Sequence, residues 1–266
     1  MAGRIIAFGG KGGSGKTTLA AMVLRRLLAG GVRPILAVDA DPNATLGLTL
    51  GVEVRETIAD LRDRMGQAAQ QVSEIPKERL LGQWLAELLT EEAGFDLLTM
   101  GRPEGPKCYC YVNGLLRRYL KELRDNYAAI VVDCEAGMEY LSRLTVDDVD
   151  ALVLVAEATP IGLKSAERIS LLADSLPVRV HRKILACNKV GQTPDGDDAT
   201  PSGPLAGACR IRVPFDADLR GRCVRGQPID DSAGGAARPA VEELARLCLP
   251  STAENPQKTM QKEPIS

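Results

Sequence analysis

The sequence predicts an α/β fold, with a doubly wound and mostly parallel sheet of about seven strands and helices on both faces. The first observation is a series of short, almost continuously apolar segments rich in Ile, Val, Leu and Ala, typical of strands buried on both faces. The second is that amphipathic helical patterns separate these segments, as crossovers between parallel strands require. The third is a glycine-rich loop between the first apolar segment and the first helical pattern.

Each expected strand is an apolar run of strand length. In chain order, the runs are residues 4–8, 34–39, 96–100, 128–133, 151–156, 183–187 and 209–213. Helical periodicity, with apolar residues three and four positions apart, marks residues 17–29, 113–126, 162–176 and 239–249. Residues 191–207 are rich in Gly, Pro and Asp and are expected to form a loop.

Length and composition indicate a single domain. The chain has 266 residues, is 45% hydrophobic and 26% charged, and carries a formal net charge of −2. We expect one domain over residues 1–249 and a disordered polar tail over 250–266. The balanced charge gives no global basic field for nucleic acid, and no segment has the form of a signal peptide or a membrane span. We therefore expect a cytoplasmic protein that binds neither nucleic acid nor membrane.

The loop GGKGGSGKTT (9–18) contains the pattern GxxxxGK(S/T) between a strand and a helix. Glycines let such a backbone wrap a phosphate chain with its N–H groups turned inward, and the helix adds its positive N-terminal end. Lys16 is expected to reach the β and γ phosphates, and the Thr17 hydroxyl to bind Mg²⁺. The sequence predicts a P-loop NTPase with the nucleotide-binding residues Gly10, Lys11, Gly12, Gly13, Ser14, Gly15, Lys16, Thr17 and Thr18.

Lys11 directly follows the first glycine of the motif, and the resulting GKGGxGKT resembles the deviant Walker A loop of one ATPase family. This family includes septum-site determining and chromosome-partition ATPases, the nitrogenase iron protein and several metal-insertion ATPases. The resemblance implies a nucleotide-sandwich homodimer in which Lys11 reaches the ATP bound by the other chain. There it would stabilise charge that develops on the transferred phosphate, so Lys11 and Lys16 are both expected to be catalytic.

Two of the expected strands end in acidic residues. The second strand runs into Asp39 and Asp41, a segment that resembles the first switch of the family. Asp41 would orient the attacking water, and Asp39 would lie near the Mg²⁺ shell. The fourth strand ends at Asp133, which resembles a Walker B acid that holds Mg²⁺, and Gly137 would make the second switch mobile.

A further set of residues bears on the nucleotide base. Asn188 follows the sixth expected strand, but the guanine-reading pattern NKxD is absent because Gly191 occupies its last position. The resemblance places Asn188, Pro214 and Asp216 around adenine. ATP is therefore favoured over GTP.

The segment GPKCYCYVNG (105–114) carries Cys108 and Cys110, separated by one tyrosine. In an extended chain, residues i and i+2 point the same way, so both thiols can face one site. A Ni²⁺ or Zn²⁺ site takes about four ligands, and a twofold-symmetric dimer would double two thiolates into four. Two incidental thiols or a redox pair are the alternatives. We expect a Ni²⁺ or Zn²⁺ site at the dimer interface.

The same segment resembles the CYCxxN region of the nickel-insertion ATPases that mature carbon monoxide dehydrogenase, and VVDCEAGMEYL resembles their second switch. The resemblance implies an ATP-hydrolysing nickel chaperone whose client is apo carbon monoxide dehydrogenase. Two alternatives stay open: an iron–sulfur reductase component resembling the nitrogenase iron protein, and a partition or positioning ATPase. The other cysteines are expected to be small buried side chains, namely Cys134, Cys187, Cys209, Cys223 and Cys248.

Overall fold

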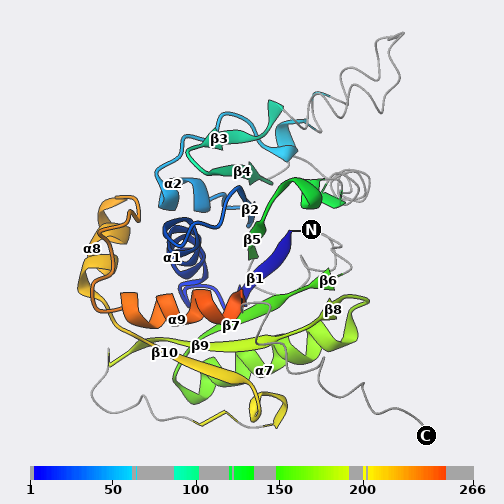
Figure 1. Cartoon of the computed structure of the whole chain (residues 1–266). Helices are drawn as coiled ribbons and strands as arrows, with labels where there is room; N and C mark the ends of the chain where they lie inside the picture. The colour runs from blue at the N-terminus through cyan, green and yellow to red at the C-terminus, as the bar shows by residue number, and fades with distance from the viewer. Residues whose placement is uncertain are drawn as a thin grey trace, which may run out of the picture.

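The computed structural model of the chain describes residues 3–61, 64, 87–101, 120–121, 123–134, 148–191, 200–201 and 203–249. These residues form a central sheet that is covered by helices on both sides (Figure 1). The sheet is eight-stranded, in the order β10-β9-β7-β1-β5-β2-β4-β3. This arrangement confirms the predicted doubly wound α/β fold.

All the expected strands are present, and they pair in parallel with their neighbours in the sheet. The sheet also contains β3, an antiparallel edge strand that pairs with β4 and was not predicted, because its sequence Thr-Glu-Glu is short and polar. Two more short strands, β6 and β8, pair in a separate small sheet. The bounds are β1 Arg4–Gly10, β2 Ile35–Ala40, β3 Thr90–Glu92, β4 Phe95–Thr99, β5 Ala129–Cys134, β6 Asp148–Val149, β7 Ala151–Glu157, β8 Arg179–Val180, β9 Lys183–Val190 and β10 Cys209–Pro214.

Three of the expected helices are present at nearly the predicted positions as α1, α7 and α9. The helix expected over 113–126 lies largely outside the described residues, and its last turn is the 3₁₀ helix η1 (Arg124–Asn126). Within the expected loop 191–207, the described part contains the 3₁₀ helix η2 (Gly203–Leu205). The α-helices are α1 Lys16–Ala29, α2 Leu46–Leu50, α7 Pro160–Ser175, α8 Ala217–Arg225 and α9 Arg238–Cys248. No helix within the described ranges is both long and apolar enough to cross a membrane.

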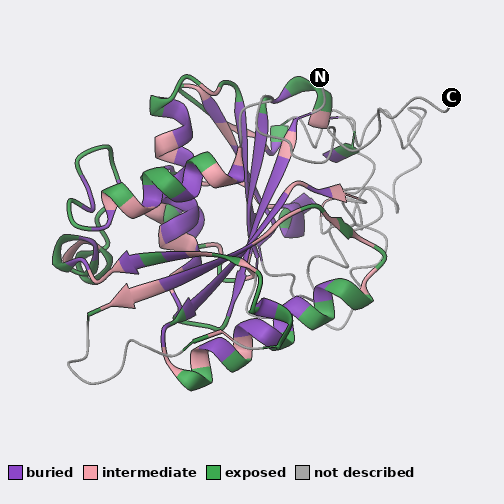
Figure 2. Cartoon of the chain, turned by 60° about the horizontal axis from the view of Figure 1, so that its bottom comes forward, coloured by how far each residue is buried: buried purple, intermediate pink, exposed green. Residues whose placement is uncertain are grey.

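The sheet separates two apolar cores, because successive strand residues point to opposite faces. On β1, Ile6 and Phe8 face the core beneath α1 and α9, whereas Ile5 and Ala7 face the core beneath α7. Buried residues therefore run along the central strands without a break (Figure 2). This explains why the strand sequences are continuously apolar.

Gly10, the last residue of β1, lies against the backbone of β7. A Cβ atom there would come within 2.3 Å of the Val155 carbonyl oxygen and 2.9 Å of the Ser14 hydroxyl. Both strands are held by neighbours on either side, so neither backbone can move away cheaply. Only glycine fits where the chain leaves the sheet to form the P-loop (residues 10–17).

Replacing Gly10 with alanine is expected to lower the free energy of unfolding by about 1–3 kcal/mol, because the methyl group meets a strand carbonyl. Urea unfolding would measure the change. Gly207→Ala is the matched control, since its Cβ would meet no atom within 4 Å and should change stability by less than about 1 kcal/mol. Equal effects of the two substitutions would show that the close approach at Gly10 is unimportant.

Candidate active site

The candidate site lies at the carboxyl edge of the parallel strands. β1 lies between β5 and β7 in the sheet, so the P-loop emerges where neighbouring crossovers run in opposite directions. The register pairs Asp133 with Phe8 on one side and with Asp39 on the other. The sheet thus brings the P-loop and both predicted acidic strand ends together, although they lie far apart in the sequence.

The P-loop has the backbone that its glycines predict. Gly13 and Gly15 adopt the left-handed region, with φ of 79° and 96°, and Gly15 is the N-cap residue of α1. Lys16 is buried and its ammonium donates to the carbonyl oxygen of Lys11 at 3.4 Å, whereas Lys11 is itself exposed. The loop therefore closes on itself around the Lys16 side chain, and the side chain of Lys11 faces outward.

Thr17 and Asp133 form the part of the site that suits a divalent cation. The Thr17 hydroxyl donates a hydrogen bond to Asp133 Oδ2 at 2.6 Å, while Asp133 Oδ1 is buried and has no hydrogen-bond partner in the described part of the chain. Hard oxygen donors of this kind are the ligands that Mg²⁺ prefers. The Ser14 hydroxyl is another buried oxygen that no described residue contacts through a hydrogen bond. These unsatisfied groups fit a site that Mg²⁺ and phosphate oxygens would complete.

Asp39 has a different set of contacts. Its carboxylate accepts the N–H of Leu46 at 2.7 Å through one oxygen and the N–H of Asp41 at 3.2 Å through the other. Asp39 therefore fixes the loop between β2 and α2, which includes Asp41. The carboxylate of Asp41 is partly exposed and accepts both the backbone and the side-chain N–H of Asn43.

The two buried acids have raised pKa values. Burial raises the pKa of Asp133 to about 7; the hydrogen bond from Thr17 lowers it, and the negative charge of Asp39 raises it further. Burial likewise raises the pKa of Asp39 to about 6, against the lowering effect of the N–H groups of Leu46 and Asp41. Two carboxylates side by side in a dry environment make a site that positive charge would stabilise.

The residues predicted for the base lie on the other side of the P-loop. The Asn188 amide donates to the Ser14 carbonyl oxygen at 2.8 Å, and Pro214 ends β10. The Asp216 carboxylate instead accepts backbone N–H groups from Leu219, Ala236 and Ala237. Burial alone would raise the pKa of Asp216, but these N–H groups and that of Asp218 hold it below its ordinary value. Contact of these residues with adenine stays a prediction.

The cysteines divide into two groups. Cys134, Cys187 and Cys248 are buried as expected, but the expectation was wrong for Cys209 and Cys223, which are exposed. Cys209 begins an edge strand, and Cys223 lies on the outer helix α8, 3.8 Å from the Thr18 hydroxyl. Because α8 carries few apolar residues, only its tertiary contacts reveal which side is exposed.

The predicted metal-binding residues Cys108 and Cys110 lie outside the described residues, as does Gly137. Within the described ranges, no group of three or more His, Cys, Asp and Glu side chains is placed to hold a metal ion. The Ni²⁺ or Zn²⁺ site therefore stays a prediction from sequence.

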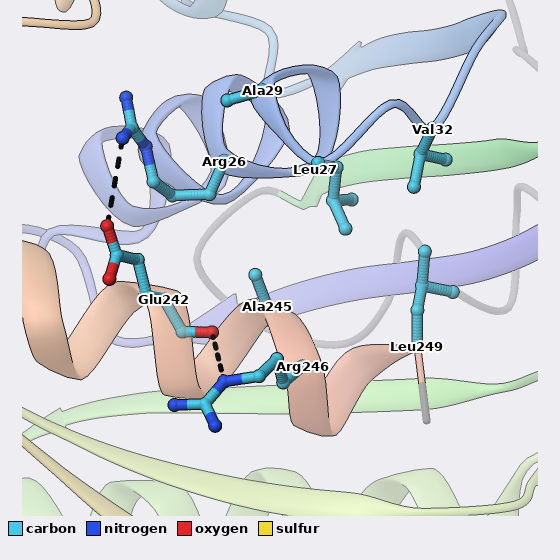
Figure 3. Close-up of a pocket in the computed structure, with 9 residues that line it drawn as sticks. Arg26, Leu27, Ala29, Val32, Glu242, Ala245, Arg246 and Leu249 are labelled. Atoms are coloured by element: carbon cyan, nitrogen blue, oxygen red, sulfur yellow. Dashed lines mark hydrogen bonds and ion pairs between the residues drawn. The ribbon is translucent and has the colours of Figure 1, made fainter. Parts of the chain in front are cut away.

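A groove elsewhere on the molecule is distinct from this site. It lies between the C-terminal half of α1 and helix α9 (Figure 3). Leu27, Ala245 and Leu249 line it, and the ion pair between Arg26 and Glu242 spans it at 3.9 Å. The P-loop lies at the opposite end of α1, so the groove has no part in phosphate binding.

The raised pKa values make the stability of the nucleotide-free protein depend on pH. The folded chain keeps protons on Asp39 and Asp133 that the unfolded chain releases above pH 3.8, so stability should fall as the pH rises from about 4 to about 7. Asp133→Asn removes the free-energy cost of ionising a buried carboxyl group at this position, and it keeps an oxygen that can accept the hydrogen bond from Thr17. At pH 8 it should raise the free energy of unfolding by roughly 2–4 kcal/mol, since one pKa unit is worth about 1.4 kcal/mol.

Thermal unfolding in EDTA at pH 4 and pH 8 would measure this effect, with little difference between Asp133→Asn and the unchanged protein at pH 4. Asp39→Asn is the matched control. An amide has one acceptor oxygen and would turn its NH₂ group toward a backbone N–H, so it should destabilise the protein at both pH values. An Asp133→Asn protein less stable than the original at pH 8 would contradict the argument.

Comparisons with known proteins agree with this geometry. The family model described as an AAA domain matches residues 3–184. An uncharacterized ATP-binding protein of Methanocaldococcus jannaschii is 42% identical over 190 residues, which are 70% of this chain and 74% of the relative. The carbon monoxide dehydrogenase accessory protein CooC of Rhodospirillum rubrum is 32% identical over 230 residues, or 81% of this chain and 85% of CooC.

A solved structure shares the fold. The septum site-determining protein MinD of Pyrococcus horikoshii OT3, complexed with Mg-ADP, has a TM-score of 0.63 and 21% sequence identity, with 92% of this chain and 95% of MinD covered. The parallel sheet, the P-loop at its carboxyl edge and the family match lead to one conclusion. The chain belongs to the AAA-domain family and is a P-loop ATPase, and it shares its fold with MinD.

Proposed function

We propose that this ATPase is a nickel chaperone that loads Ni²⁺ into apo carbon monoxide dehydrogenase. The observation that carries the proposal is its similarity to CooC over 81% of the chain, together with the Cys108-Tyr109-Cys110 segment. In this proposal the protein acts in the cytoplasm as a homodimer and binds neither nucleic acid nor a membrane. Residues 1–249 would make up one ATPase domain, with 250–266 as a tail.

The fold supports a link between the nucleotide site and the cysteine segment. The N–H of Met100 donates to the carbonyl oxygen of Asp39 at 2.9 Å, just after β4 ends. Gly101, the next residue, is the last described one before the segment. The chain that carries Cys108 and Cys110 thus leaves the sheet beside a buried carboxylate of the candidate active site. A shift of Asp39 during the nucleotide cycle would act directly on the start of that segment.

Each residue of the site has a role in the proposed hydrolysis. Asp41 orients a water molecule that attacks the γ-phosphorus; the bond to the ADP oxygen breaks, and ADP and phosphate leave. Thr17 and Asp133 would hold Mg²⁺, which neutralises charge on the phosphates when bound. Lys16 contacts the β and γ phosphates, and Lys11 of each chain reaches the ATP of the other.

Metal and nucleotide would be coupled through the dimer. ATP closes the two chains on each other and brings the cysteine pairs together, so that four thiolates bind one Ni²⁺ as cargo. Hydrolysis opens the dimer and loosens the metal site. By linkage, Ni²⁺ and ATP favour the same closed state and each strengthens binding of the other. Zn²⁺ could occupy the same thiolates.

The first test of this proposal is metal stoichiometry. With ATP present, the anaerobically purified protein should bind one Ni²⁺ per two chains, and Ni²⁺ should shift it from monomer to dimer. Cys108→Ser and Cys110→Ser should each lose this site. The double variant Cys209→Ser/Cys223→Ser is the matched control. It removes two exposed thiols elsewhere on the protein and should keep the Ni²⁺ site. Equilibrium dialysis with metal analysis and analytical ultracentrifugation would measure both quantities.

Retention of one Ni²⁺ per dimer by Cys108→Ser would contradict the nickel proposal. A monomer–dimer equilibrium that Ni²⁺ does not change would also contradict it. A [4Fe–4S] signal in electron paramagnetic resonance would favour the iron–sulfur alternative. ATP-dependent binding to DNA that survives loss of both Cys108 and Cys110 would favour the partition alternative. The proposed client is tested by an activation assay: the protein with ATP and Ni²⁺ should activate apo carbon monoxide dehydrogenase.

The role of Asp41 gives a separate prediction. Asp41→Ala should reduce kcat for ATP hydrolysis by about 100-fold or more, because the attacking water loses the group that orients it. ATP binding should persist, since the P-loop and the acids Asp39 and Asp133 are unchanged. Phosphate release and nucleotide affinity would be measured together. A wild-type kcat in Asp41→Ala would assign the water to another residue.

A further inference from the structure

Two adjacent residues at the end of β9 contact two successive carbonyl groups of the P-loop. The Asn188 amide donates to the Ser14 carbonyl oxygen at 2.8 Å, and the Lys189 ammonium donates to the Gly13 carbonyl oxygen at 2.7 Å. Asn188 had a predicted role at the base, but no role was predicted for Lys189. The contact at Gly13 indicates that Lys189 belongs to the nucleotide site as well.

The backbone at Lys189 is unusual in a way that makes both contacts possible. Neighbouring residues of a regular strand point to opposite faces of the sheet. Lys189 has φ of 59°, in the left-handed region that lysine rarely adopts. The register also slips here: Cys187 and Val190 of β9 pair with Arg212 and Pro214 of β10, so β9 contains one extra residue. This bulge turns two successive side chains toward the same loop.

Glu157 orients the Lys189 ammonium. It ends β7, the strand next to β9, and its carboxylate lies 2.9 Å from Lys189 Nζ. Both side chains are partly exposed, so the ion pair by itself adds little to global stability. Its effect is directional, because it leaves the ammonium between an acidic side chain and the Gly13 carbonyl. Glu157, Lys189 and Gly13 thus join the ends of two strands to the P-loop.

The contact fixes one peptide plane from both sides. The C=O of Gly13 and the N–H of Ser14 belong to the same planar, trans peptide unit and point in opposite directions. Lys189 holds the carbonyl, and the N–H of Ser14 donates to the Lys11 carbonyl oxygen at 3.2 Å. This second bond closes the turn that carries Lys11. A glycine-rich loop that is not held in this way can adopt many conformations. Ordering it when phosphate binds would cost conformational entropy and weaken binding.

We propose that Lys189, oriented by Glu157, is a positioning residue for ATP hydrolysis that holds the P-loop in its phosphate-binding conformation before ATP arrives. It also holds the turn that presents Lys11. The proposal rests on the ATPase activity of the chain and is independent of nickel. All of its tests are made without nickel, so its failure would leave the chaperone proposal standing, and the reverse holds too.

The test uses Lys189→Asn. Asparagine tolerates the left-handed conformation better than lysine, so the strand end should fold normally, but its short side chain cannot replace the ammonium. We expect the melting temperature without nucleotide to stay close to the original. The Kd for ATP and the KM should both rise about 10-fold, with a smaller change in kcat, because the loop must now be ordered during binding. Calorimetric titration and steady-state hydrolysis measure these values.

Two further variants make the result specific. Glu157→Gln should weaken ATP binding about 2–5-fold, and Lys189→Asn/Glu157→Gln should be no weaker than Lys189→Asn alone, because Glu157 acts through Lys189. Lys164→Met is the matched control: it breaks the 3.0 Å ion pair with Glu167 on α7 and should leave ATP affinity unchanged. Unchanged affinity in Lys189→Asn, or an additive loss in the double variant, would overturn the proposal.

Discussion

The structure depends on two acidic side chains that are buried side by side at the carboxyl edge of the sheet. Asp39 and Asp133 occupy paired positions on β2 and β5, and both are fully buried. Each acid connects the sheet to a functional segment. Asp133 accepts a hydrogen bond from the hydroxyl of Thr17 in the P-loop. Asp39 accepts hydrogen bonds from backbone N–H groups of the loop that contains Asp41. Changes at this pair therefore reach the P-loop and the loop with Asp41 together.

This arrangement is unfavourable for an empty protein. Burial disfavours the charged form of a carboxylate, and a second carboxylate nearby disfavours it further, which is why the pKa values of both acids are raised. The fold tolerates the cost because the sheet around the acids is held by continuous apolar strands on both faces. A divalent cation would remove the repulsion between the two carboxylates. Part of the free energy that the empty protein loses by burying them would then be recovered when Mg²⁺ and nucleotide bind. Oδ1 of Asp133, which has no hydrogen-bond partner among the described residues, is a candidate ligand for this cation.

Opposite the acids, the strand ends on the other side of β1 shape the P-loop itself. Gly10 lets the loop leave the sheet against β7, and the bulge in β9 directs Asn188 and Lys189 to its carbonyl groups. In the proposed nucleotide site, one side would thus supply charge for the cation, and the other would supply a fixed backbone for the phosphates. Preorganised donors of this kind need little rearrangement during catalysis, which is the main reason that they are effective.

Much of this could be predicted from the sequence, because strand burial, helix periodicity and the P-loop pattern are local. The sequence by itself determined the doubly wound fold, the position of the phosphate-binding loop and the acids Asp39 and Asp133 at strand ends. Other features depend on contacts between distant segments. Only the tertiary structure decided that β3 joins the sheet edge, that Asp216 caps a helix and that Cys209 and Cys223 are exposed. Lys189 belongs to this second group, because a one-residue slip between β9 and β10, invisible in either strand alone, turns it toward a loop 176 positions away.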